Sequence, residues 1–529
     1  MEKCLKSTLL ILFVLAMAFM VVGCDLLGPE PETYLVFYNN NGATGGSTPT
    51  QQVKTHDVGL TIAGNTGNLV KTGFTFNGWN TKANGTGTAY APGSTYTGNA
   101  NITLYAQWVA ASYTITYHAN GATGGTVPSD QEKTHGTDLT LSTNTGSLVK
   151  TGYTFAGWST QADGSGTTYA EGATYSTNAT TTLYARWIVP VSSVSAGYEH
   201  TMFITSDGSL WGMGDNSYGQ LGVGDTEDKL SPIKIMDNVK AVSAGSYHTL
   251  ILKDDDTLWA AGNNTSGKLG DGTTTHRSSP VQIADEVEAI SAGNSHSLVL
   301  KTDGKLYAMG YNLFGQLGIG STETKYSPTY VTDNVKNISA GSSHSLILKN
   351  DDTLWAAGYN FGGQLGDGTT TNRNTPVQAM TGVNNISAGG SHSLAVTNDD
   401  ELYVFGYNDR GQLGNDSTDD VLTPLKLLDN VKYASAGYAH SHFLKTDGTV
   451  WAMGLNNNGQ LGDGTTTNSS IPIQVESNVK RLSPGSSYTM MIIKTDDTLW
   501  ATGRNLQGQL GDGTTTSRST FELVPIELE

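Results

Sequence analysis

The residues best placed to do chemistry in this 529-residue chain are histidines that recur at a fixed spacing. One histidine occupies the same position of a 48-residue repeat in six consecutive copies, and a tyrosine takes that position in the seventh. The set is His200, His248, His296, His344, His392, His440 and Tyr488. Imidazole is a common metal ligand, so a ring of histidines suggests a metal site. On a ring with a radius of roughly 8 Å, however, neighbours would lie about 7 Å apart, too far to share a zinc ion bound at about 2.0–2.1 Å. We therefore expect these histidines to form structural hydrogen bonds and to bind no metal ion.

The other groupings that carry catalysis do not occur on any single element of the sequence. It contains no local Ser-His-Asp grouping, phosphate-binding loop or metal-ligand cluster. The acidic run Asp254-Asp255-Asp256 lies where other copies have an Asp-Gly turn, which favours a hairpin turn over a calcium site. The sequence predicts a protein that is not an enzyme and uses no cofactor.

Both cysteines of the chain, Cys4 and Cys24, lie close to its start. A disulfide framework in the folded part is therefore excluded. Two lysines precede an apolar run from Leu9 to Val22, which is short for a membrane-spanning helix and has the form of a secretory signal peptide. The run ends in Val-Val-Gly-Cys.

This ending resembles the lipobox of bacterial lipoproteins, in which a cysteine is diacylated before the leader is removed. The resemblance implies a signal peptide over residues 1–23, a lipidated Cys24 and a polar tether over residues 24–33. Two or three acyl chains would give a stable membrane anchor. An ordinary signal peptide, or an anchor helix with a chance cysteine, is the alternative. The expected location is extracytoplasmic, in the cell envelope, on the cell surface or the periplasmic face.

Residues 191–529 consist of seven copies of the 48-residue repeat. The copies begin at Val191, Val239, Val287, Val335, Val383, Val431 and Val479. Each contains Ser-[Ala/Pro]-Gly, an apolar strand, a turn, a second strand, an Asn-x-x-Gly loop and a strand that bears proline. Four short strands at this period are typical of a propeller blade, which buries its faces only by stacking on its neighbours. The sequence predicts an all-β protein with a seven-bladed β-propeller.

The phrases Ser-Ala-Gly-x-x-His and Gly-x-Asn-x-x-Gly-Gln-Leu-Gly resemble the repeat of the regulator of chromosome condensation family over residues 191–526. The resemblance implies a seven-bladed ring that closes on itself. The seventh copy departs from the pattern, because Pro484 and Tyr488 replace the usual alanine and histidine. It also has one extra residue, which we place in the run 490–493 and expect to form a β-bulge.

Two earlier segments, residues 34–108 and 113–187, align with each other without a gap. Both contain Gly-[Phe/Tyr]-Thr-Phe-x-Gly-Trp and end in Leu-Tyr-Ala-x-Trp. These phrases resemble the internalin-type B repeat, or Listeria–Bacteroides repeat, which implies a small β-grasp-like module of bacterial surface proteins. Their tryptophans are expected in the core or between modules. With linkers of a few residues, the pair should form a semi-rigid spacer between the membrane and the propeller.

Charge argues against nucleic acid as a partner. The net charge is −18, and no cluster of lysine and arginine is present to replace the counterions of phosphates. The only expected membrane contact is the lipid anchor.

Variable positions of the repeat indicate a binding surface. Because the first strand of a blade rises to Ser-Ala-Gly and the third rises to Gly-x-Asn, both loops are expected on one face. The variable residues there are rich in aromatic side chains, which supply contact area at low entropic cost. The candidates are Tyr198, Glu199, Tyr218, Tyr247, Tyr311, Phe314, Tyr359, Phe361, Tyr407, Asp409, Arg410 and Tyr438.

These features predict a surface-displayed lipoprotein in which a propeller head on a two-module stalk binds a protein or glycan, at the envelope or on a host. One alternative is guanine-nucleotide exchange, the founding activity of the propeller family. Others are a secreted enzyme inhibitor, as in the related propeller-type β-lactamase inhibitor protein, and a polysaccharide-acting enzyme.

Overall fold

The computed structural model of the chain describes residues 30–484 and 488–526, and every regular element in these ranges is a β-strand. The predicted all-β class is confirmed. The predicted signal peptide, Cys24 and the first part of the tether lie outside the described residues. Within the described ranges, no helix is long and apolar enough to cross a membrane.

The two small modules share one topology. The first contains β1 (Thr33–Asn39), β2 (Gln52–Thr55), β3 (Leu60–Thr61), β4 (Phe74–Asn80), β5 (Ala89–Tyr90), β6 (Thr95–Tyr96) and β7 (Ile102–Ala110). The second contains β8 (Ser112–His118), β9 (Gln131–Thr134), β10 (Leu139–Thr140), β11 (Thr154–Ser159), β12 (Thr168–Tyr169), β13 (Thr174–Tyr175) and β14 (Thr181–Ile188). Each forms a five-stranded sheet, in the orders β2-β1-β7-β4-β5 and β9-β8-β14-β11-β12, and a two-stranded sheet, β3-β6 or β10-β13. In both five-stranded sheets the first and last long strands pair in parallel.

A tryptophan fills the core of each module. Trp79 and Trp158 are almost fully buried, and their indole N–H groups donate to the carbonyls of Ala63 and Ser142, at 2.9 Å in both cases. Burial of an indole with its N–H satisfied stabilises the core. The predicted core role is confirmed for these two tryptophans.

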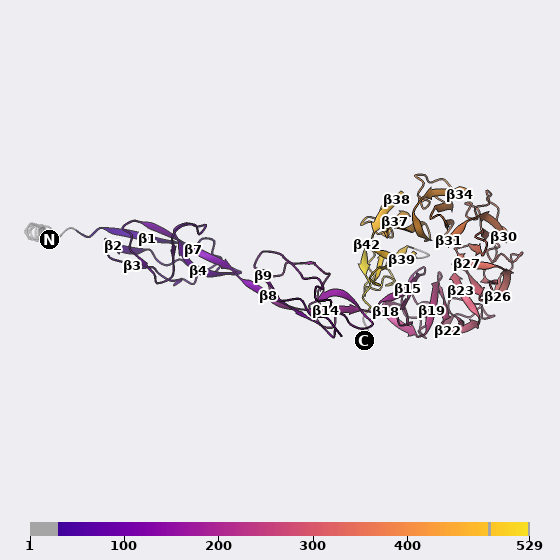
Figure 1. Cartoon of the computed structure of the whole chain (residues 1–529), viewed down its shortest axis with the longest axis horizontal. Helices are drawn as coiled ribbons and strands as arrows, with labels where there is room; N and C mark the ends of the chain where they lie inside the picture. The colour runs from indigo at the N-terminus through magenta and orange to yellow at the C-terminus, as the bar shows by residue number, and fades with distance from the viewer. Residues whose placement is uncertain (1–29, 485–487, 527–529) are drawn as a thin grey trace, which may run out of the picture. The chain divides into compact units, whose positions relative to one another are not determined.

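The propeller consists of seven four-stranded sheets, or blades, each built from one continuous repeat. The first strands, which lie innermost in Figure 1, are β15 (Val191–Ala196), β19 (Val239–Ala244), β23 (Val287–Ala292), β27 (Val335–Ala340), β31 (Val383–Ala388), β35 (Val431–Ala436) and β39 (Val479–Pro484). The second strands are β16 (His200–Thr205), β20 (His248–Lys253), β24 (His296–Lys301), β28 (His344–Lys349), β32 (His392–Thr397), β36 (His440–Lys445) and β40 (Thr489–Lys494). The third strands are β17 (Leu210–Gly214), β21 (Leu258–Gly262), β25 (Leu306–Gly310), β29 (Leu354–Gly358), β33 (Leu402–Gly406), β37 (Val450–Gly454) and β41 (Leu499–Gly503). The outermost strands are β18 (Lys229–Met236), β22 (Arg277–Ala284), β26 (Lys325–Thr332), β30 (Arg373–Met380), β34 (Val421–Leu428), β38 (Ser469–Glu476) and β42 (Arg518–Leu523).

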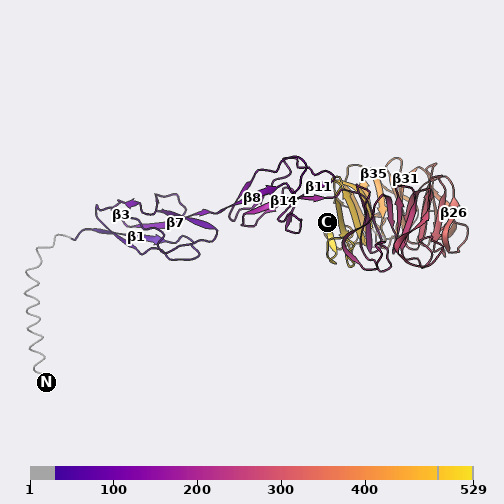
Figure 2. The same cartoon turned by 90° about the horizontal axis from the view of Figure 1, so that it is seen from below.

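The hydrophobic core lies between blades. Leu250, Leu258 and Leu269 of the second blade pack with Val299 and Met309 of the third in one cluster. Leu269 belongs to the Gly-[Gln/Lys]-Leu-Gly phrase, and its burial between blades agrees with the requirement that a blade stack on its neighbours. Figure 2 shows the ring from the side, with strands that run between two faces formed by the connecting loops.

A hydroxyl group bridges most junctions between blades. Ser345 of the fourth blade lies 2.9 Å from Nε2 of His296 in the third blade, and its Oγ donates to the carbonyl of Gln316 at 2.7 Å. Because the hydroxyl proton goes to the carbonyl, Nε2 of the histidine must carry the donated proton. The same pairs, at 2.9–3.0 Å, are His200–Thr249, His248–Ser297, His344–Ser393 and His392–Ser441.

A second set of bonds links the innermost strands. At every junction except that of the sixth and seventh blades, the serine of the Ser-[Ala/Pro]-Gly phrase accepts the backbone N–H of the alanine in the next blade, as in the 2.9 Å bond from Ala340 N to Ser291 Oγ. The ring closes through the same bond, from Ala196 N to Ser483 Oγ at 3.1 Å, together with a 2.9 Å bond from Thr201 Oγ1 to the Gln509 carbonyl. The first and last blades therefore meet through ordinary junction contacts.

The glycine of this phrase is required by close packing. A Cβ on Gly341 would lie 2.5 Å from Cε1 of His344 and 2.6 Å from the carbonyl of Gly389. The histidine ring and the next blade thus occupy the space that any side chain would need.

Two predictions for the seventh blade are wrong. Thr489 pairs with Gly503 in the way that His440 pairs with Gly454, so Thr489, and not Tyr488, occupies the histidine position. Strand β40 pairs residue by residue with β41 through Met490, Met491, Ile492 and Ile493, so the extra residue does not form a bulge there. Because Thr489 takes the histidine position, the extra residue falls before Thr489 in the sequence.

This shift weakens the junction between the sixth and seventh blades. Met490 takes the place of the bridging hydroxyl, and the ring nitrogens of His440 make no hydrogen bond of ordinary geometry among the described residues, although the Thr489 backbone lies near. Pro484 stands at the alanine position and has no N–H to donate to Ser435. A bond from Thr502 Oγ1 to the Gly459 carbonyl, at 3.0 Å, partly compensates.

His442, near the same junction, also departs from the repeat pattern, and it leads to a prediction about stability. It is fully buried beside His440, with ring centroids 5.5 Å apart, where four other blades carry leucine. Its nitrogens make no hydrogen bond of ordinary geometry among the described residues, although the Leu461 backbone lies near. A buried polar group without a partner costs about 1–3 kcal/mol. His442→Leu is therefore expected to raise the free energy of unfolding by about that amount, measured by urea denaturation.

His392→Leu is the matched control, because His392 bonds Ser441 and its loss leaves that hydroxyl without its donor. This variant should be destabilised. A loss of stability in both variants would show that His442 is as well accommodated as the other histidines.

Candidate binding face of the propeller

Two sets of loops meet on one face of the propeller, as the strand order predicts. The loop between the first and second strands of each blade is bonded to the start of the loop between the third and fourth. Backbone bonds of this kind run from Asp215 N to the Glu199 carbonyl (2.8 Å), from Asn263 N to the Tyr247 carbonyl (2.7 Å) and from Tyr359 N to the Ser343 carbonyl (2.8 Å). We call this surface the loop face. The bonds fix the two loops of a blade as one unit.

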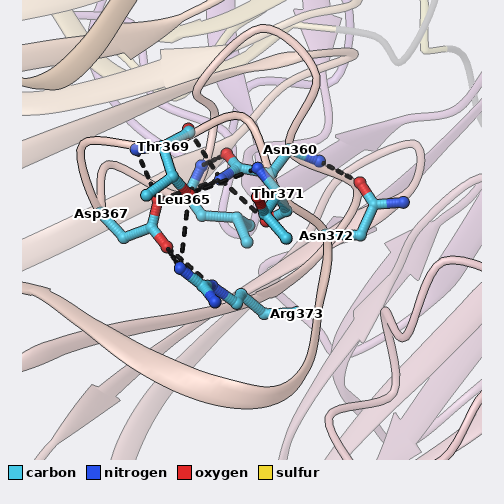
Figure 3. Close-up of polar contacts among 7 residues, drawn as sticks. All are labelled: Asn360, Leu365, Asp367, Thr369, Thr371, Asn372 and Arg373. Atoms are coloured by element: carbon cyan, nitrogen blue, oxygen red, sulfur yellow. Dashed lines mark hydrogen bonds and ion pairs between the residues drawn. The ribbon is translucent and has the colours of Figure 1, made fainter.

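A buried asparagine shapes the longer loop. In the fourth blade, Asn360 accepts the N–H of Leu365 at 3.0 Å and donates to Oδ1 of Asp367 at 3.0 Å and to the carbonyls of Thr369 and Thr371 at 2.9 and 3.1 Å. The backbone N–H of Asn360 in turn donates to Asn372 Oδ1 at 2.9 Å (Figure 3). One side chain thus ties together backbone groups along the whole loop, and equivalent asparagines are buried in the other blades.

An ion pair completes this network. Arg373 donates from Nε and Nη2 to Oδ2 of Asp367, at 2.8 and 2.7 Å (Figure 3). Burial alone would raise the pKa of Asp367, but hydrogen bonds from Thr369, Arg373 and Asn360 outweigh burial and hold the pKa below its ordinary value. The same pair recurs as Asp271–Arg277 and Asp512–Arg518. The recurring phrase Asp-Gly-Thr-Thr-Thr is the sequence signal for this loop anchor, and the sequence analysis did not assign it a role.

The predicted aromatic residues form two groups on the loop face. In the first, the ring centroids of Tyr198 and Tyr247 are 5.4 Å apart, and those of Tyr218 and Tyr247 are 5.5 Å apart. Burial, reinforced by the charge of Glu199, raises the pKa of Tyr247 to about 12. Tyr247 is therefore a packed support for Tyr198 and Tyr218, so this group presents a rigid surface.

The second group lies on the third and fourth blades. Phe314 packs between Tyr311 and Tyr359, with centroid distances of 6.2 and 5.0 Å, and Phe361 stacks on Tyr359 at 6.5 Å. Phe361 is 71% exposed and Leu313, which the sequence analysis did not single out, is 61% exposed. Large apolar side chains this accessible, held on a packed aromatic base, are typical of contact residues.

The remaining candidates have different surroundings. Tyr438, 42% exposed, packs against Tyr488 at 6.0 Å, so Tyr488 belongs to the loop face. Tyr407 is exposed. The adjacent Asp409 and Arg410 pair at 3.5 Å and remain accessible.

Glu199 has an internal role at the ring closure. It forms a 2.7 Å ion pair with Arg504 of the seventh blade, and only 12% of its side chain is exposed. Burial raises the pKa of Glu199, and the charge of Arg504 opposes that shift. We therefore interpret Glu199 as a contact between the first and last blades, and Arg504 as a residue that the sequence analysis missed.

The histidines are buried and neutral at ordinary pH. Burial is the main cause of a lowered pKa at each of them. The pKa is about 4 for His200, His344 and His440, about 3 for His296 and His392, and well below its ordinary value for His248 and His442. Within the ranges that the structure describes, no group of three histidine, cysteine, aspartate or glutamate side chains could hold a metal ion. Hydrogen bonding across junctions is the role that the geometry gives five of these residues, His200, His248, His296, His344 and His392.

Comparisons with protein families match both parts of the chain. A profile of the RCC1-like domain matches residues 143–442, which is more than half of the chain. Regulator of chromosome condensation (RCC1) repeats match residues 431–460 and 447–492, and the Listeria-Bacteroides repeat domain matches residues 34–107. These matches confirm both predicted resemblances.

Individual relatives share shorter segments. A protein of Evansella cellulosilytica that is named as a Gly-rich membrane protein is 33% identical over 174 residues, 32% of this chain and 20% of that protein. The ultraviolet-B receptor of Arabidopsis thaliana is 49% identical over 45 residues, 8% of this chain and 10% of the receptor. The chain thus spans only a small part of these relatives.

Solved structures show the same propeller. Yeast RCC1 (Prp20), solved in complex with Kap60, is 20% identical with a TM-score of 0.53, covering 59% of this chain and 84% of that one. Human WBSCR16 is 22% identical with a TM-score of 0.52, covering 63% and 96%. The predicted propeller fold is therefore confirmed.

The lowered histidine pKa values lead to a prediction about pH. Below the ordinary histidine pKa of about 6.5, the unfolded chain takes up protons that the buried rings of the folded chain refuse. The free energy of unfolding should therefore fall as pH drops from about 6.5 toward 4, by about 1.4 kcal/mol per pH unit for each proton. Urea denaturation at constant ionic strength measures this slope.

The His442→Leu variant isolates one contribution, because it should lower the slope between pH 6.5 and 5 by about one proton. Carboxylates of the unfolded chain bind protons mainly below that window, since their pKa values are about 3.9 and 4.3. Stability that is independent of pH from 6.5 to 5 would contradict burial of neutral histidines.

Proposed function

This chain belongs to the family of RCC1-like domains, and from that premise we propose that its propeller is a recognition head that binds a protein partner through the loop face. The observation that carries this proposal is the exposed apolar surface of Phe361 and Leu313, held on the packed aromatic base of Tyr359 and Phe314. Binding energy at protein interfaces concentrates in such rigid apolar anchors.

Names of related proteins support a protein partner. Yeast RCC1 was solved bound to Kap60, and a study of Prp20p from Saccharomyces cerevisiae describes its binding to Gsp1p and histones. Kap60, Gsp1p and histones are partners of the yeast protein. A glycan remains the second candidate for this chain, because tyrosine and phenylalanine rings also pack on sugar surfaces.

We further propose that the protein is displayed outside the cytoplasm by a lipid on Cys24. The support is the apolar leader that ends in Val-Val-Gly-Cys, and the naming of the Evansella relative as a membrane protein. In this arrangement the two small modules act as a stalk, and the propeller is free to meet a partner at the envelope or on a host.

The binding proposal predicts the effect of two exposed side chains. Phe361→Ser together with Leu313→Ser should weaken partner binding by at least about tenfold, since loss of anchor residues costs about 2 kcal/mol or more. Because both side chains are exposed, the thermal unfolding midpoint should not change. The partner is captured from envelope or host extracts with the full chain and then titrated, and a glycan array is run in parallel.

Tyr330→Ser is the control, because Tyr330 is 47% exposed but lies on the outermost strand β26. It should bind as the unchanged protein does. If the double variant binds normally, or if Tyr330→Ser loses as much, the loop face is not the recognition surface.

The display proposal predicts that the Cys24→Ala protein is no longer found in the membrane fraction. Without the thiol, diacylation cannot occur, and loss of the acyl chains removes the anchor. Fractionation of cells that express either form, with detection of lipid by metabolic labelling, measures this. A Cys24→Ala protein that stays with the membrane would contradict lipid anchoring.

A further inference from the structure

The axis of the propeller holds a cavity that neither aromatic group of the loop face lines. The innermost strands enclose a cavity of about 340 Å³. Its wall includes a ring of serines, one from each blade: Ser195, Ser243, Ser291, Ser339, Ser387, Ser435 and Ser483. The described residues that line it include no aspartate or glutamate, in a protein whose net charge is −18. The cavity is therefore polar without being acidic.

The serine ring supplies hydrogen-bond donors. Where the Oγ accepts the backbone N–H of the next blade, as Ser291 and Ser339 do at 2.9 Å, the hydroxyl keeps its own proton to donate. These hydroxyls stand at the cavity wall, so the donors are available to a molecule inside the channel.

The channel wall is uneven at the position two residues before each serine. Three consecutive blades carry small residues there, and the next four carry larger polar ones. In chain order the residues are Ser193, Ala241, Ala289, Asn337, Asn385, Tyr433 and Arg481. Asn337, Asn385 and Tyr433 line the cavity. The small residues leave room on one side of the axis and the polar residues gather on the other.

Arg481 is the one charged residue of this set. It lies on β39, beside Tyr433 of β35 at the equivalent position of the neighbouring blade. Tyr433 is 36% exposed and lines the channel, where burial raises the pKa of its hydroxyl and the nearby charge of Arg481 opposes that rise. Arg481 is exposed and is not itself among the residues that line the cavity, but it takes the strand position that Tyr433 takes in the neighbouring blade, and its charge lies near the Tyr433 hydroxyl.

Arg481 also differs from every other arginine of the propeller. The others each have a carboxylate partner, in the pairs Arg277–Asp271, Arg373–Asp367, Arg410–Asp409, Arg504–Glu199 and Arg518–Asp512. No carboxylate in residues 30–484 and 488–526 pairs with Arg481. Its immediate neighbour Lys480 is paired, with Asp497 at 2.6 Å. Among the described residues, the guanidinium therefore has no anionic partner.

We propose that the central channel binds a compact oxyanion, a carboxylate or phosphate group on a small polar molecule, held by Tyr433 and Asn385 of the wall and by the guanidinium of Arg481, which reaches toward Tyr433 from the neighbouring blade. The planar guanidinium matches two oxygens of a carboxylate or phosphate at once. The amide of Asn385 and the hydroxyls of Tyr433 and the serine ring donate to the remaining oxygens. A volume of about 340 Å³ lies at the lower end of the range for small-molecule sites, which suits a ligand no larger than a single sugar acid.

The test uses two probes with the full chain, inorganic phosphate and glucuronate, each titrated by calorimetry at constant ionic strength with chloride as the blank anion. At least one should bind saturably at one site per chain, and the two arms distinguish phosphate from carboxylate. Arg481→Gln should weaken that binding by at least about tenfold, as loss of a charge-assisted bidentate pair does. Tyr433→Phe should weaken it by less.

Lys480→Gln is the matched control, because it removes a positive charge one residue away that is already paired. It should bind within about twofold of the unchanged protein, as expected for an exposed pair of small energetic value. The thermal unfolding midpoints of all variants establish that they are folded. Absence of saturable binding of both probes, or equal losses in Arg481→Gln and Lys480→Gln, would overturn the proposal. Loop-face binding is independent of this result.

Discussion

The hydrogen bond that crosses from a buried histidine to the hydroxyl of the next blade is the interaction on which the rest of the propeller depends. In a junction such as that of His296, Ser345 and Gln316, three side-chain and backbone groups from neighbouring blades satisfy one another in a site without water contact. A buried donor left unpaired costs about as much as a whole hydrogen bond contributes. At the five junctions that carry this bond, each blade therefore holds the next in one rotation about the axis, and the loops at its end are fixed with it.

The two candidate surfaces follow from this constraint in different ways. On the loop face, anchors such as Asn360 and the Asp367–Arg373 pair stiffen loops whose tips carry Phe361 and Leu313. A rigid tip loses little entropy on binding. In the channel, the repeated serines form a uniform ring, whereas the position two residues before each serine differs between blades and is Arg481 in the seventh. Both proposed binding sites depend on positions at which the blades differ, whereas the positions that the blades share build the ring.

The period of 48 residues and the repeated phrases were enough to predict the blades, their number and the face on which the loops meet. They were not enough to place the extra residue of the seventh copy, because an insertion before Thr489 and one after it leave the same apolar run. Strand pairing with Gly503 decides between them. The Glu199–Arg504 pair joins residues from opposite ends of the repeat array, and the charge of Arg481 lies near Tyr433 only across a blade junction. Contacts of this kind depend on how the ring closes, which a single sequence does not encode locally.

The claim that the loop face recognises a partner is tested most directly by hydrogen exchange of the full chain, with and without the partner that it captures. Binding at that face should slow exchange in the loops around residues 197–199, 311–315 and 359–363, and leave the hairpins between the second and third strands unchanged. Protection confined to those hairpins or to the two small modules would contradict the account.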